Sequence, residues 1–289
     1  MAWQLSIILG LALLTTHSLF LKTKANFFTE HALVCTAVIY SLTIFPVGIS
    51  YGLYRGETLF DYSPEIWILF GVVGLVFTVF NFLEIKSLAK IQLSQYVVLS
   101  NFRVVATALV SGIFFDQIIQ FWQWFGVALV VGASIVMVLP DINLKSAKID
   151  RFSWLALIGA LSLGLGLSIE GRILDEISIA DYLFFGWAAQ TIGSVLAGAP
   201  RIRKASEEIF NRRTLGALFI IGCLRVGIGV SIIYSISKSE NAALISAILS
   251  AATVTSVLGA YVFLKERDHF TVKIVGTVMS VCGVVILLA

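Results

Sequence analysis

The chain has 289 residues, 58% of them hydrophobic, and a formal net charge of +3. Only 13% are Asp, Glu, Lys or Arg, whereas ordinary soluble domains carry about 25%. A soluble fold of this length needs more charge to cover its surface, so the composition indicates a membrane protein.

A helix needs about 20 apolar residues to cross the hydrocarbon core of a bilayer. Stretches with almost no charge predict eight such helices, at 1–21, 31–54, 66–83, 117–139, 152–169, 182–199, 241–264 and 270–289. Two further stretches, 91–115 and 214–237, are equally apolar but carry Arg103 and Arg225 at their midpoints. Half-spans would be too short to cross, so we predict both as spanning helices. The predicted fold class is an all-α membrane protein with ten transmembrane helices.

The loops predict the orientation of these helices. Fourteen lysines and arginines fall in the five loops that follow each odd-numbered helix, and only three fall in loops on the opposite face. Because basic loops stay in the cytoplasm, we expect both termini outside. The predicted location is the cell membrane, plasma or inner, with multiple passes.

Catalytic and metal-binding motifs are absent from the sequence. The three cysteines lie apart in apolar stretches, the three histidines form no metal-spaced set, and no phosphate-binding or hydrolase motif occurs. Basic residues form no patch for nucleic acid. We therefore expect no enzymatic activity, no metal and no bound cofactor.

An internal repeat is suggested when the chain is shifted by 150 residues. The hydropathy pattern and loop lengths of the two halves then coincide, although residue identity stays near the random level. The halves, 1–140 and 141–289, would each hold five helices. Because five is odd, they would cross the membrane in opposite senses, as in many transporters with a substrate site between two inverted repeats.

The ends of both halves carry related motifs. The second half carries "FLKERDHFTVKIVG" at 263–276, and the first carries the weaker "FFDQIIQFWQWFG" at 114–126. These motifs resemble the EamA-like repeat of the drug/metabolite transporter superfamily. The chain lacks the proline that this family often has in the middle of the fourth and ninth helices. The resemblance implies a secondary carrier or exporter of small metabolites.

Arg103 is the leading candidate for substrate binding. A charge at the centre of a span costs about 2.5–3.5 kcal/mol, so the residue should face a cavity or the bundle interior. Tyr96, Ser100 and Thr107 share its helical face. The 150-residue shift maps this stripe onto the ninth helix, at Ser246, Ser250 and Thr253. The alternative is a buried ion pair with Glu84 or Glu170.

Arg225 is the second candidate, because glycines flank it on the same helical face. Two inward arginines favour a carboxylate or phosphate on the substrate, because guanidinium binds such groups through two parallel bonds. Glu84, Glu170 and His17 are weaker candidates, as proton carriers or counter-ions, because the simpler interpretation of each is a packed or solvated side chain.

These observations predict a secondary transporter that moves a small polar metabolite, anionic or zwitterionic, by alternating access. The alternatives are a flippase for lipid head groups, a membrane enzyme acting on a phosphate head group, and a non-transporting membrane scaffold. The expected partners are a small-molecule metabolite and membrane lipids. The sequence leaves open whether the protein is a monomer or a homodimer.

Overall fold

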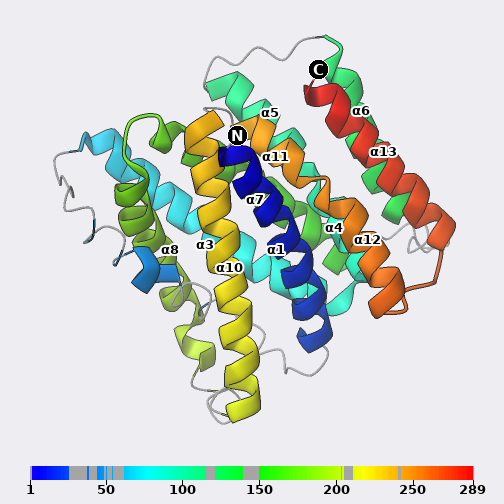
Figure 1. Cartoon of the computed structure of the whole chain (residues 1–289), viewed down its shortest axis with the longest axis horizontal. Helices are drawn as coiled ribbons and strands as arrows, with labels where there is room; N and C mark the ends of the chain where they lie inside the picture. The colour runs from blue at the N-terminus through cyan, green and yellow to red at the C-terminus, as the bar shows by residue number, and fades with distance from the viewer. Residues whose placement is uncertain are drawn as a thin grey trace.

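The structure is a computed structural model that describes residues 2–25, 38, 44–48, 50, 54, 62–114, 121–138, 150–202, 204, 211–239 and 242–288. Within these residues the chain forms helices and no strand, which confirms the all-α class (Figure 1). In chain order the helices are α1 (Ala2–Ala25), α3 (Pro64–Lys90), α4 (Leu93–Ser100), α5 (Phe102–Phe114), α6 (Gln123–Val138), α7 (Arg151–Leu174), α8 (Ile179–Ile202), α10 (Arg212–Ser239), α11 (Ala242–Leu249), α12 (Ala252–Phe263) and α13 (Phe270–Leu288).

Six spans in the described part are long and apolar enough to cross a membrane. They are Trp3–Ala25, Pro64–Lys90, Leu93–Phe114, Arg151–Leu174, Thr214–Ser239 and Ala242–Phe263. Trp124–Ala133 and Phe270–Gly283 are shorter apolar helices. Helix α8 has spanning length but is less apolar, because it carries Asp181, Tyr182 and Gln190. The predicted span at 31–54 lies largely outside the described residues.

Side-chain exposure fits a lipid surrounding. Large apolar side chains point outward along several helices, with Ile68 and Leu75 on α3 and Leu196 on α8 all more than 60% exposed. Soluble monomers rarely expose apolar surface on this scale. Buried polar residues, by contrast, gather inside the bundle. The outer surface is therefore apolar, as lipid requires, and the interior combines apolar clusters with buried polar side chains.

Two of the long helices begin at a residue whose side chain caps the first turn. Ser63 accepts a hydrogen bond from the backbone N–H of Ile66, and Pro64 takes the first position of α3, where its missing N–H costs nothing. Asp150 accepts one from the backbone N–H of Phe152 at the start of α7. The chain therefore specifies where these two largely apolar helices begin.

The helices pack in pairs around a common centre. Helix α3 packs on α7 and α8, α1 on α10, α5 on α7, and α6 on α13. Figure 1 shows the α6–α13 pair at one edge of the bundle and α1 running antiparallel to α10. Glycines allow the closest approaches, since a Cβ on Gly164 of α7 would lie 2.4 Å from the Arg103 carbonyl oxygen of α5.

The predicted helices at 91–115 and 241–264 are each divided in the structure. Asn101 separates α4 from α5, and Ser250 and Ala251 separate α11 from α12. At both places backbone N–H groups bond three residues back instead of four, as from Asn101 to Val98 and from Ala251 to Ile248. These tight turns occur without a proline at either position.

Candidate substrate site

A cavity of about 110 Å³ lies at the centre of the bundle, lined by side chains from nine of the described helices and from residue 44. This is room for several water molecules or a small solute. Most of the wall is apolar. Its polar side chains are Ser18, Glu84, Tyr96, Ser100, Arg103, Glu170, Tyr182, Gln190, Arg225, Thr253 and Ser256.

The divided helices bring the first arginine to this cavity. The two interruptions lie against each other, because Thr253 donates a hydrogen bond of 3.1 Å to the Asn101 side-chain oxygen. Asn101 in turn donates to the Ser280 hydroxyl of α13. Arg103 sits two residues beyond its interruption and lines the cavity together with Thr253. Both interruptions therefore place polar side chains at the same wall.

Arg103 is buried but weakly bonded. Its guanidinium donates to the Ser100 carbonyl oxygen at 3.3 Å, the Ser100 hydroxyl at 3.4 Å and the Ser250 hydroxyl at 3.4 Å. Charge-assisted hydrogen bonds are normally about 2.7–2.9 Å long. No carboxylate lies within ion-pair distance of Arg103 in the part of the chain that the structure describes. Its donors are therefore available to a bound anion.

Arg225 has stronger partners within the protein. Its Nη2 atom donates to the Asn81 side-chain oxygen at 2.9 Å, and its Nη1 atom lies 3.7 Å from Oε2 of Glu84. The guanidinium carbon also lies 5.2 Å from the centre of the Phe80 ring. The alternative of a buried ion pair thus applies to Arg225, and Glu84 is its carboxylate.

Each glutamate in the cavity wall is hydrogen-bonded to a tyrosine. Tyr96 of α4 bonds to Glu84 of α3, and Tyr182 of α8 bonds to Glu170 of α7. All four side chains are less than 10% exposed. Oxygen Oε2 of Glu84 accepts no hydrogen bond from the described residues, although Arg225 lies nearby. The cavity therefore contains two cationic and two acidic side chains, each acid bonded to a neutral phenol.

The remaining predicted site residues lie behind the wall. Thr107 donates to the Arg103 and Gly164 carbonyl oxygens and lies 3.5 Å from the Ser246 hydroxyl. Ser250 accepts a hydrogen bond from Arg103, donates one to the Ser246 carbonyl oxygen and does not line the cavity. His17 is fully buried within electrostatic range of Arg225 and is not among the residues that line the cavity. Their predicted roles in binding remain predictions.

Several residues that line or support the cavity are not among the predicted site residues. Asn81 binds Arg225, yet its side-chain nitrogen is fully buried without a hydrogen-bond partner among the described residues. Tyr182, Gly186 and Gln190 recur every four residues and so share one face of α8. That spacing could have identified a cavity wall on α8. Trp187, which packs against Gly229, has no such pattern.

Metal binding finds no support in this geometry. Among the described residues, no group of three His, Cys, Asp or Glu side chains could hold an ion.

The chain resembles known proteins in its fold and in the sequence of its second half. No curated protein matches the chain. One solved crystal structure has a TM-score of 0.63 at 16% sequence identity, covering 98% of this chain and 96% of that one, and this likeness shows the fold alone. The model of the EamA-like transporter family matches residues 152–289. This match over the second half of the chain agrees with the resemblance that the sequence motifs indicate.

Proposed function

We propose that the protein is a secondary transporter that moves a small polar metabolite with an anionic group, alone or as part of a zwitterion, by alternating access. The observation that carries the proposal is the central cavity, which both Arg103 and Arg225 line, in a chain whose residues 152–289 match the model of a transporter family. Neither a cofactor nor a covalent step is part of this function.

The weak bonding of Arg103 supports an anionic group on the substrate. Removing an arginine from water is unfavourable unless the charge gains a partner. Serine oxygens at 3.3–3.4 Å are poor partners for a guanidinium. A carboxylate or phosphate would make two short parallel bonds with it. The tyrosines and hydroxyl groups around it would bind the rest of the solute.

The match between the two halves supports alternating access. Shifted by 150 residues, α1 would span 152–175, and α7 spans Arg151–Leu174. The same shift moves the interruption at Asn101 to Ala251. It also exchanges the α1–α10 and α3–α7 contacts, which are both extensive. Two inverted five-helix repeats would account for these correspondences, and such repeats alternate by rocking against each other.

The contacts between the divided helices support a binding site at the interface of the two halves. Helix α4 packs on α12, and α5 packs on α11. Arg103 from the first half reaches Ser250 in the second. A motion of one half against the other would therefore reshape the cavity around a bound solute.

A screen of the purified protein tests this function. Soluble amino acids and organic anions are added in a thermal-shift assay, because a ligand that binds the folded state raises the melting temperature. Stabilising compounds are then tested for uptake into proteoliposomes, with protein-free liposomes as the control. Uptake of a compound that stabilises the protein is the expected result.

Two other outcomes would overturn the proposal. Movement of labelled lipids between leaflets, without uptake of any soluble compound, would indicate a flippase. A protein that transports neither class, and that tolerates uncharged replacements of both arginines except in assembly, would be a scaffold.

A further inference from the structure

Charged side chains bind the turn between α3 and α4 from two sides, and we call these contacts the grip. At the end of α1, the Lys22 ammonium donates hydrogen bonds to the carbonyl oxygens of Leu88 and Ile91, at 2.9 and 2.7 Å. From the α12–α13 loop, the Glu266 carboxylate accepts bonds from the backbone N–H groups of Leu93 and Ser94, at 2.7 and 3.0 Å. The last carbonyls of α3 and the first N–H groups of α4 are thus satisfied by charged side chains.

Glu266 makes a third bond that involves no helix end. The Ser94 hydroxyl donates to Oε2 of Glu266 at 2.7 Å, the oxygen that also accepts the bond from the Ser94 N–H. Lys22 also lies within electrostatic range of the carboxylate. Because Ser94 belongs to the first half of the chain and Glu266 to the second, these bonds join the two halves.

The loop around Glu266 is itself held in an unusual shape. Lys265 and His269 have positive φ angles of 58° and 51°, a backbone region that residues with side chains rarely adopt. The Glu266 N–H donates to the Ala260 carbonyl oxygen at 3.2 Å, and Lys273 donates to the Glu266 carbonyl oxygen at 3.4 Å. The surrounding contacts therefore fix the direction in which the carboxylate points.

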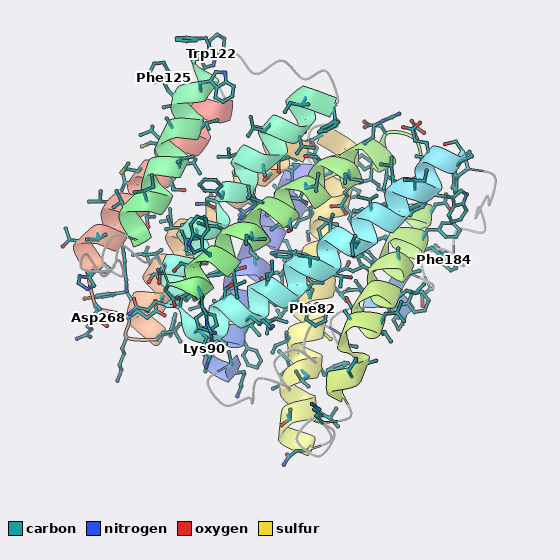
Figure 2. The ribbon with its side chains drawn as sticks, turned by 180° about the vertical axis from the view of Figure 1, so that it is seen from behind. Phe82, Lys90, Trp122, Phe125, Phe184 and Asp268 are labelled. Atoms are coloured by element: carbon teal, nitrogen blue, oxygen red, sulfur yellow. The ribbon has the colours of Figure 1, made fainter. Side chains whose placement is uncertain are left out.

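An apolar cluster, which we call the end seal, packs beside this grip. It consists of Leu21, Ile85, Leu88, Leu93, Val257 and Ala260, all 1% exposed or less. These side chains come from α1, α3, α4 and α12. Figure 2 shows Lys90 and Asp268, which flank the grip, at the end of the bundle opposite Trp122 and Phe125. The cavity-lining residues Glu84 and Tyr96 lie within one helical turn of the seal.

We propose that Glu266 is a latch that keeps this end of the transporter closed. Opening here separates α12 and its loop from α4, so the three hydrogen bonds of the carboxylate must break before the end seal can part. Glu266 does not line the cavity. It therefore shifts the balance between the closed state and the state open toward the side of the lysine- and arginine-rich loops, and it does not contact the ligand. This inference rests on the alternating access of the proposed function.

Accessibility of the cavity tests the latch without a known substrate. A single cysteine replaces the lining residue Leu163, the native Cys35, Cys223 and Cys282 are changed to serine, and a membrane-impermeant thiol reagent is applied from each side. In Glu266→Gln, labelling from the basic-loop side should become several-fold faster and labelling from the other side slower. Ser94→Ala, which removes one of the three bonds, should give a smaller shift in the same direction.

The matched control lies in the same loop. Asp268 is exposed and accepts one long bond, 3.3 Å, from Gln92, so Asp268→Asn should label like the parent. Melting curves recorded in parallel show whether each variant folds. Unchanged labelling in a folded Glu266→Gln protein, or an equal rise from both sides, would overturn the latch while leaving the transport function intact. A parent protein labelled from neither side, yet reactive once denatured, would contradict alternating access itself.

Discussion

At the scale of single residues, the two central arginines have different surroundings. Arg225 is matched inside the protein by Asn81, Glu84 and Phe80, whereas the hydrogen bonds of Arg103 to the described residues go to serine oxygens at 3.3–3.4 Å. We therefore propose different roles for the two arginines: Arg225 completes the buried polar structure, and Arg103 binds a solute.

Removing the charge of Arg103 should impair transport more than stability. Arg103→Gln takes a charge away from the middle of a span, which eases insertion, and leaves no carboxylate stranded within ion-pair distance. Uptake should fall sharply, and Arg103→Lys should recover only part of it, because an ammonium group cannot make two parallel bonds. Thermal melts alongside uptake in proteoliposomes measure both effects. A mutant that melts early but still transports would remove Arg103 from the binding site.

Removing the charge of Arg225 should impair stability first. Arg225→Gln leaves the Glu84 carboxylate buried without its cation, and breaking a buried pair in this way costs about 3–5 kcal/mol. The double variant Arg225→Gln, Glu84→Gln should melt at a temperature closer to that of the parent. If the second substitution gives no rescue, the 3.7 Å pair does not stabilise the fold.

At the scale of helices, glycines determine how closely neighbours approach. A Cβ on Gly74 of α3 would lie 2.8 Å from a backbone carbon of Ala189 on α8. On the same helix, Gly71 has open space around it. The two positions are one turn apart and differ only in what they face.

This pair of glycines gives a matched test of helix packing. Gly74→Ala should destabilise the protein by about 1–3 kcal/mol, because α3 and α8 must move apart. Gly71→Ala should be neutral or stabilising by up to about 1 kcal/mol, because alanine favours helix. Differential scanning of the two variants in detergent measures the difference. Equal melting temperatures of the two variants would mean that α3 and α8 are not in close contact.

The breaks between α4 and α5 and between α11 and α12 could not be predicted from the sequence. The apolar length of both segments predicts spanning helices, and no proline or glycine marks Asn101 or Ala251 as a break. The breaks depend on partners from distant parts of the chain, such as Thr253 for Asn101. Hydropathy describes a segment and its solvent, so it cannot anticipate a turn that a neighbouring helix stabilises.

At the scale of the whole molecule, hydropathy predicts the all-α class, because the lipid surrounding constrains every spanning segment in the same way. The family resemblance comes instead from the motif at 263–276. Hydropathy also places Arg103, Arg225 and Tyr96 near a cavity, since a buried charge must turn inward. It misses Tyr182 and Trp187 because aromatic residues are equally common at lipid interfaces and in cores. Which arginine pairs with Glu84 depends on distances that only the fold determines.

The orientation of the bundle is a further prediction at this scale. The excess of lysine and arginine in five loops places the 200–213 loop in the cytoplasm. An impermeant thiol reagent outside intact cells should reach a cysteine at Gly56 or Ser239 but not one at Ala205. Labelling at Ala205 in intact cells would show that the true orientation is the reverse of the predicted one. The Glu266 latch would then open on the opposite side of the membrane.

The paired arginines and glutamates of the cavity have an electrical consequence. With all four ionised, their formal charges cancel, so a loaded transporter carries only the charge of its solute. A monovalent anion crossing 100 mV gains or loses about 2.3 kcal/mol, which is about 50-fold in its equilibrium ratio. A potassium diffusion potential imposed on proteoliposomes should therefore drive an anion toward the positive side and leave a zwitterion unaffected. An anion that ignores the voltage would have to travel with a compensating positive charge, and the glutamates of the cavity are the side chains placed to carry it as a proton.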